Sequence, residues 1–285
     1  MTTDIWAEWI RSRRTGGDAV YERAMLAGLA EVRDRVLDNA ALVSGETLVD
    51  VGCGDGLIGF GALARGADVV FSDVSDDLLG DCRAVAERTG VLERCRFVKA
   101  PAQDLGVIDD GSADVVTTRS VLIYVEEKER ALTEFHRVLR RGGRVSLFEP
   151  VNRFGMEERR CTWGYAAAGA EELMGKVSAV FEAAQPETDP MLDFDERDLL
   201  RLVEDVGFFP ITLEYRAQIK PIEARRWETF LRMSGNPKIP TFAEAMEQAL
   251  TSDERDELVS VLRPAVEAGR GVWRMGHAYL WAVKP

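Results

Sequence analysis

The chain has 285 residues and a formal net charge of −13. Nucleic acids and anionic membranes would repel this much negative charge, so we expect neither as a partner. Hydrophobic residues make up 46% of the sequence and charged residues 30%, which is typical of a soluble globular protein with enough apolar material for a core.

The cysteines give no sign of a metal site. Cys53, Cys82, Cys95 and Cys161 lack the paired spacing of metal ligands, so we expect free thiols and no bound metal. The N-terminus has no signal-peptide hydrophobic region, and no apolar stretch is long enough to cross a bilayer. We therefore expect a cytoplasmic protein in a reducing compartment.

The first 44 residues are predicted to form two helices. Trp6, Trp9 and Ile10 recur at helical spacing and predict a short amphipathic helix, and basic residues that include Arg14 follow it. A longer helix is expected over residues 19–41. Two interpretations of the first helix stay open: it packs on the body through its tryptophans, or it forms a lid over a bound ligand.

Residues 47–60 carry the most informative pattern in the chain. An apolar run over 48–51 predicts a strand buried on both faces, and leucine, isoleucine and phenylalanine at helical spacing follow from residue 57. Between them lie Gly52, Gly54 and Gly56, which predict a tight turn whose backbone approaches a ligand. The N–H groups at the helix start would attract an anionic or electron-rich group.

Two cofactors fit this turn. Residues 54–59 satisfy the dinucleotide fingerprint G-x-G-x-x-G, and Asp73 ends the next strand at about the place of a ribose-binding acid. However, Asp50, at the end of the first strand, suits a cationic sulfonium better than a diphosphate. The run from Asp50 to Gly56 resembles motif I of the class I S-adenosylmethionine-dependent methyltransferases. For Asp73, capping of the following helix is a competing interpretation.

Strands and helices then alternate in a regular order. We expect strands at 68–73, 95–99, 112–118 and 144–149, and helices at 76–88 and 127–139, which predicts a parallel sheet with helices on both faces. Ligands in such sheets bind at the carboxyl ends of the strands. The resemblance implies that these ends hold S-adenosylmethionine through Asp50, Gly52, Cys53, Gly54, Gly56, Asp73, Val74, Ala102, Gln103 and Arg119, with Arg14 near its methionine carboxylate.

The second half completes the expected fold. The family resemblance implies a doubly wound, seven-stranded Rossmann-like α/β sheet with an antiparallel end strand and helical insertions. We expect N-terminal helices or a lid at 1–44, a cofactor-binding core at 45–150, a helical insertion at 151–194, a core helix and strand at 195–216, a second insertion at 217–276 and a final strand at 277–285. The two insertions would roof the strand ends and build the substrate pocket.

The resemblance implies transfer of a methyl group from S-adenosylmethionine to an acceptor, with release of S-adenosylhomocysteine. The size of the two insertions and the acidic composition favour a small-molecule acceptor, a natural product or metabolite, and hence a role in secondary metabolism. Tyr124 and Glu149 are candidate bases, although Glu149 fits a hydrogen-bonded carboxylate at a strand end equally well. His277 is a third candidate whose place at the start of a strand favours packing. We expect a monomer or homodimer. A NAD(P)-dependent oxidoreductase and a catalytically silent S-adenosylmethionine-binding regulator remain alternatives.

Overall fold

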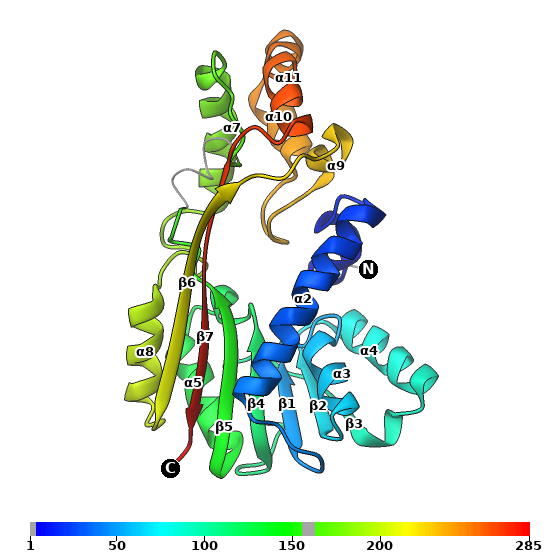
Figure 1. Cartoon of the computed structure of the whole chain (residues 1–285), viewed down its shortest axis with the longest axis vertical. Coiled ribbons are helices and arrows are strands. Elements are labelled where there is room, and N and C mark those ends of the chain that lie inside the picture. Colours follow the sequence, from blue (N-terminus) through cyan, green and yellow to red (C-terminus); the bar gives the residue numbers. More distant parts are fainter. Residues whose placement is uncertain (1–3, 156–162) are drawn as a thin grey trace. The chain divides into compact units, whose positions relative to one another are not determined.

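The computed structural model describes residues 4–155 and 163–285, so Cys161 lies outside the described residues. The chain divides into two compact units (Figure 1). The sheet unit comprises Met25–Val151, Phe194–Arg216 and His277–Pro285, and the helical unit comprises Met1–Ala24, Asn152–Asp193 and Ala217–Gly276. Each unit is therefore assembled from three separate stretches of sequence.

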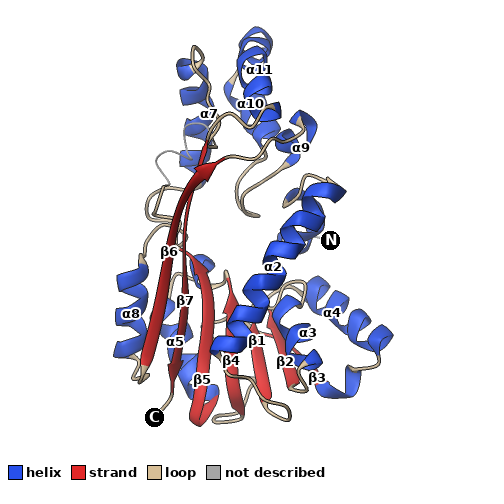
Figure 2. Ribbon diagram, viewed as in Figure 1, coloured by secondary structure: helices blue, strands red, loops and turns tan. Residues whose placement is uncertain are grey.

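The sheet has seven strands in the order β3-β2-β1-β4-β5-β7-β6 (Figure 2). Neighbouring strands among the first five in this order are parallel, whereas β7 runs antiparallel to β5. This confirms the predicted fold class. The strands are β1 (Thr47–Val51), β2 (Asp68–Asp73), β3 (Cys95–Lys99), β4 (Ala113–Arg119), β5 (Leu139–Pro150), β6 (Ile211–Pro221) and β7 (Val272–Val283).

Helices cover the sheet because the central strands are apolar on both faces. The second half of α2 (Ala19–Asn39) packs with α3 (Leu57–Ala64) and α4 (Asp76–Thr89) in one hydrophobic cluster that includes Leu48, Val69 and Phe71. α5 (Lys128–Val138) contacts β5 and α8 (Glu196–Asp205). The short helices η2 (Leu92–Arg94) and η3 (Leu122–Tyr124) complete the connections.

Local capping explains where two of these helices begin. The Ser75 hydroxyl accepts a hydrogen bond from the Leu78 N–H at 3.0 Å, so Ser75 rather than Asp73 caps α4 through its side chain. Asp195 and Asp198 form a reciprocal capping box at the start of α8.

Several strands are longer than predicted because their partners are distant in sequence. β5 begins at Leu139 rather than at residue 144, and the backbone groups of Gly142 and Gly143 bond to Lys284 at the end of β7. β7 begins at Val272, whose N–H donates to the Gly164 carbonyl at 2.7 Å. β6 spans Ile211–Pro221 and so continues past residue 216, where the core helix and strand were expected to end.

The helical unit has its own aromatic core. It is built on α7 (Glu171–Ala184), α9 (Trp227–Arg232), α10 (Phe242–Ala249) and α11 (Ser252–Glu267). Phe230 and Phe242 are almost completely buried, with ring centroids 4.6 Å apart. These two rings stabilise the unit itself.

The N-terminal segment is part of the helical unit. α1 (Ile5–Glu8) continues into a π-helical turn, η1 (Trp9–Arg13), in place of the single amphipathic helix expected there. The Trp9 indole donates to the Ser234 carbonyl at 2.9 Å, and the Ser234 N–H donates to the Arg13 carbonyl at 2.9 Å. The tryptophan thus fixes this segment against the loop after α9.

Candidate functional site

The glycine turn between β1 and α3 uses backbone conformations that favour glycine. Gly52, Gly54 and Gly56 have φ angles of 62°, 54° and 77°, all in the left-handed region. A Cβ atom at Gly52 would lie 2.5 Å from a methyl carbon of Val121. The turn and the loop after β4 therefore fit together only because this position has no side chain.

Asp73 links the end of β2 to this turn. Its Oδ2 accepts a hydrogen bond from the Gly54 N–H at 2.9 Å, and its Oδ1 accepts one from the Ser75 N–H at 3.0 Å. The carboxylate is buried, whereas the neighbouring Val74 is 44% exposed. A carboxylate and an accessible apolar side chain thus adjoin the turn at the carboxyl edge of the sheet, as the sequence predicted.

Asp50 binds groups within the sheet unit. Its Oδ2 accepts from the Gly59 N–H at 2.9 Å, and its Oδ1 accepts from the Thr117 hydroxyl at 3.2 Å. Burial raises the pKa of Asp50 to about 7, although both hydrogen bonds act to lower it. Asp50 therefore ties β1 to α3 and β4, while its direct contact with a cofactor stays a prediction.

Gly59, the last glycine of the apparent dinucleotide fingerprint, has a packing role. A Cβ atom there would lie 2.2 Å from the Phe71 ring. The close approach of α3 to β2 accounts for this glycine without any bound dinucleotide.

Glu149 holds the loop that follows β4. Its Oε1 accepts from the Thr118 hydroxyl at 2.9 Å and from the Val121 N–H at 3.1 Å, and its Oε2 accepts from the Ile123 N–H at 3.4 Å. The residue has no exposed surface, and burial raises its pKa to about 7. This geometry matches the hydrogen-bonded carboxylate that the sequence offered as an alternative to a base.

The two other candidates in this loop region are more accessible. Arg119 ends β4, and its guanidinium lies 3.9 Å from the Asp55 carboxylate. Ser120 follows with a φ of 58°, and Tyr124 closes the short helix η3 in a half-buried position. The structure therefore brings Arg119 and Tyr124 to the same loop region as Glu149.

The predicted adenine-side residues lie in the loop after β3. Ala102 is buried and Gln103 is half-buried.

In the glycine turn, a hydrogen bond with Cys82 and burial hold the pKa of the Cys53 thiol well above its usual value. The cysteine is therefore a protonated, buried side chain.

Arg14 belongs to the helical unit and not to the sheet unit that carries the glycine turn. Its guanidinium lies 5.8 Å from the centroid of the Trp9 ring. Its predicted role near the methionine carboxylate therefore stays a prediction.

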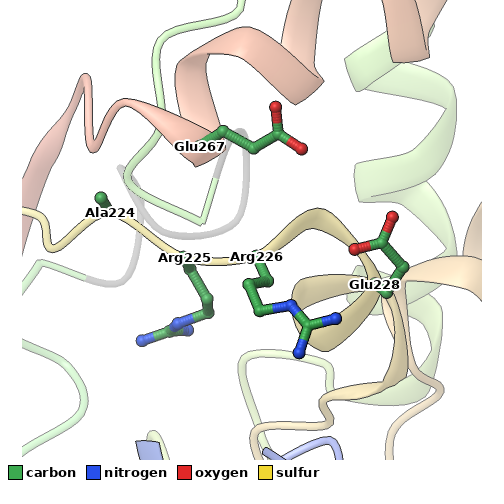
Figure 3. A pocket seen from close by; sticks show the side chains of 5 residues that line it. All are labelled: Ala224, Arg225, Arg226, Glu228 and Glu267. Carbon is green, nitrogen blue, oxygen red and sulfur yellow. The ribbon is translucent and has the colours of Figure 1, made fainter. Parts of the chain in front are cut away.

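Each unit contains a hollow of ligand size. In the sheet unit, a hollow of about 530 Å³ is lined by Asp55 and by residues of α2 and α3. Asp55 and Leu57, the first residue of α3, adjoin the glycine turn. In the helical unit, a hollow of about 410 Å³ is lined by Ala224, Arg225, Arg226, Glu228 and Glu267, and Figure 3 shows both arginine side chains extending in the same general direction. Asp73 lines neither hollow.

The sequence did not single out the hydroxyl groups that support the acids. Thr117 and Thr118 are fully buried and donate to Asp50 and Glu149. The sequence feature that could have indicated these hydroxyl groups is the pair of adjacent threonines at the end of an otherwise apolar strand. His277, set aside as a packing residue, has an Nδ1 atom that is buried without a hydrogen-bond partner among the described residues.

Two further searches cover only residues 4–155 and 163–285. Within these ranges, no helix is both long and apolar enough to span a membrane. No group of three or more His, Cys, Asp or Glu side chains in the same ranges could hold a metal ion.

Comparisons with known proteins agree with this geometry. A family model described as a methyltransferase domain matches residues 49–147. The ubiquinone biosynthesis O-methyltransferase of Dechloromonas aromatica (strain RCB) is 32% identical over 111 residues, which cover 39% of this chain and 47% of that protein. The demethylmenaquinone methyltransferase of Clavibacter sepedonicus is 38% identical over 109 residues, which cover 38% of this chain and 43% of that protein.

A solved structure of a geranyl diphosphate methyltransferase in complex with SAM shares the fold. Its TM-score is 0.55 at 18% identity, with 94% of this chain and 92% of that chain covered. The chain spans about half the length of the curated relatives it matches. Over residues 49–147 the chain therefore carries a methyltransferase domain, in agreement with the resemblance of residues 50–56 to motif I.

Proposed function

We propose that the chain transfers a methyl group from S-adenosylmethionine to a small-molecule acceptor and releases S-adenosylhomocysteine. The observation that carries this proposal is the hydrogen bond between Asp73 and Gly54, which joins a strand-end carboxylate to the glycine turn inside the methyltransferase domain. The domain match favours this function over the dinucleotide interpretation of residues 54–59.

The chemistry of the donor set fits S-adenosylmethionine. The Asp73 carboxylate can accept hydrogen bonds from ribose hydroxyls, and the exposed Val74 beside it offers an apolar surface to the adenine. We assign the adenine edge to Ala102 and Gln103 and the methionine part to the glycine turn. When bound, S-adenosylmethionine supplies a methyl group on a positively charged sulfur, which is already activated for in-line displacement.

The protein's remaining tasks are to position the acceptor and to exclude water. Glu149 is poorly suited to act as the general base toward an acceptor, because its oxygens already accept hydrogen bonds from Thr118, Val121 and Ile123. We assign it the positioning of the loop that carries Tyr124. Tyr124 stays a candidate for contact with the acceptor.

The relatives suggest the class of acceptor. Their names refer to ubiquinone biosynthesis and to demethylmenaquinone, so we propose a hydroxylated aromatic compound of the quinone-precursor type. The earlier expectation of secondary metabolism stays a prediction, as do a cytoplasmic location and a monomeric or homodimeric state.

Mass spectrometry of reaction mixtures tests the proposal. The purified chain is incubated with S-adenosylmethionine and a panel of catechols and hydroquinones, and Asp73→Ala is assayed in parallel. The proposal predicts a methylated product and S-adenosylhomocysteine with the natural chain and a large loss with the variant. Binding of S-adenosylhomocysteine without turnover of any acceptor would instead favour a silent regulator.

A further inference from the structure

His277 lies at the same edge of the sheet as the glycine turn. On β7 it pairs with Pro150 at the carboxyl end of β5, and the next residue, Ala278, pairs with Glu149. Glu149 accepts a hydrogen bond from the Val121 N–H, and the Val121 side chain lies so close to Gly52 that a Cβ atom added at Gly52 would touch it. A continuous series of contacts within the sheet unit thus connects His277 to the turn.

The imidazole of His277 packs in an aromatic environment. Its ring centroid lies 5.4 Å from that of Phe148 and 5.7 Å from that of Tyr279, and the residue is 8% exposed. Within the described part of the chain, the buried Nδ1 atom has no hydrogen-bond partner. A buried acceptor atom without a hydrogen bond destabilises the structure, so a ligand that supplies a donor would gain affinity here.

Positive charge faces this histidine from two elements. The guanidinium carbon of Arg35, on α2, lies 4.2 Å from the centroid of the Tyr279 ring, and Arg35 forms an ion pair with Glu214 of β6. Arg216 is the second positive residue and also lies on β6. Burial is the largest cause that holds the pKa of His277 below its usual value, and the positive charges of Arg216 and Arg35 lower this pKa further. The imidazole is therefore neutral at neutral pH, with a lone pair available on one nitrogen.

We propose that His277 is the general base of the methyl transfer, and that its Nδ1 atom accepts first the hydrogen bond and then the proton of a hydroxyl group on the acceptor. This inference rests on the proposed function and narrows the acceptor to a hydroxyl compound. A lone pair on the hydroxyl oxygen forms the bond to the methyl carbon as the bond from methyl to sulfur breaks and its electron pair goes to sulfur. When Nδ1 takes the proton, the electron pair of the O–H bond stays on the oxygen. The products are the methyl ether, S-adenosylhomocysteine and an imidazolium, which returns its proton to water. Arg35 and Arg216 favour the negative charge that develops on the oxygen.

A purely structural role for His277 predicts different behaviour, and NMR separates the two. The chain contains only two histidines, His136 and His277, so their imidazole nitrogen signals can be assigned with one variant. His136 packs against Phe208 with ring centroids 5.0 Å apart and serves as an internal control. With saturating S-adenosylhomocysteine, addition of 4-nitrocatechol and related catechols should shift the His277 signal and leave that of His136 unchanged. No shift of the His277 signal with any of these probes would overturn the proposal.

Two variants test the same inference by kinetics. His277→Phe keeps a ring for packing but cannot take a proton, and His277→Gln keeps a hydrogen-bonding group without basicity. Both should retain S-adenosylhomocysteine affinity and lose about 100- to 10,000-fold in kcat, with partial recovery at high pH where solvent base replaces the imidazole. His136→Gln should be unaffected.

The outcomes distinguish this inference from the proposed function. Folded His277 variants with the natural kcat and pH profile would remove His277 from the chemistry and leave the methyltransferase proposal intact. Failure of the natural chain to bind S-adenosylhomocysteine would overturn both.

Discussion

The carboxylate of Asp73 and the backbone N–H of Gly54 lie 2.9 Å apart and join the end of β2 to the glycine turn after β1. The same carboxylate also accepts from the Ser75 N–H. A single acid thus orders the turn and the start of α4.

Replacing Asp73 should therefore weaken cofactor binding. We expect Asp73→Ala to lower the affinity for S-adenosylhomocysteine by about 1.5 to 3 kcal/mol, because hydrogen bonds to a charged group are lost. Asp68→Asn, at the exposed opposite end of β2, is the matched control and should bind normally. Calorimetric titration measures both, and unchanged affinity in a folded Asp73→Ala variant would remove Asp73 from the site.

Gly52 should be more sensitive to substitution than a glycine with free space around it. Gly52→Ala forces a Cβ atom to 2.5 Å from Val121 in a left-handed conformation, so we expect a loss of about 1 to 3 kcal/mol of unfolding free energy. Gly80→Ala, in the middle of α4 with nothing within 4 Å of the added carbon, should stabilise by about 0.4 to 1 kcal/mol. Urea unfolding compares the two variants, and an equal effect would contradict the close fit at Gly52.

Glu149 should stabilise the folded state more at low pH than at high pH, whereas an acid whose pKa is lowered by folding does the reverse. Folding raises its pKa from 4.5 to about 7, so the folded state binds the proton more tightly than the unfolded state does. The resulting contribution is fully present below about pH 4.5 and is lost as the pH rises through about 7. Relative to Glu149→Gln, the natural chain should lose about 1 to 3 kcal/mol across this window.

Denaturant unfolding at several pH values gives that difference. The exposed Glu126→Gln is the control and should follow the natural chain at every pH. A constant difference between the natural chain and Glu149→Gln would show that Glu149 does not titrate as described.

The N-terminal segment should depend on a glycine at residue 16. A Cβ atom at Gly16 would lie 2.5 Å from the Thr229 carbonyl oxygen, whereas one at Gly17 would have nothing within 4 Å. Both positions have a positive φ, so Gly17→Ala controls for backbone strain. Trypsin should cleave Gly16→Ala at Arg11 and Arg13 sooner than Gly17→Ala, and equal rates would argue against this packing.

The sequence predicted the order and type of the elements in the sheet unit because each has a local signal. The glycine turn, the Ser75 cap and the apolar strands are all readable over a few residues. In contrast, the early start of β7 depends on backbone pairing with Gly164, which lies more than one hundred residues away in the sequence. Such pairing leaves no local pattern.

The candidate site was predictable to a similar degree. The chain order alone placed Asp50, Asp73 and Glu149 at one edge of the sheet. It could not show that Asp50 and Glu149 are buried and bonded to Thr117 and Thr118, because hydrogen-bond partners depend on the orientation of side chains across neighbouring strands. For the same reason, it gave no indication that Nδ1 of His277 lacks a partner.

The central claim is that the glycine turn binds S-adenosylmethionine. Calorimetric titration of the natural chain with S-adenosylhomocysteine, with NADH as the parallel ligand, tests it most directly. We predict micromolar binding of S-adenosylhomocysteine and no binding of NADH. Binding of NADH alone would contradict this account and make residues 54–59 a dinucleotide site.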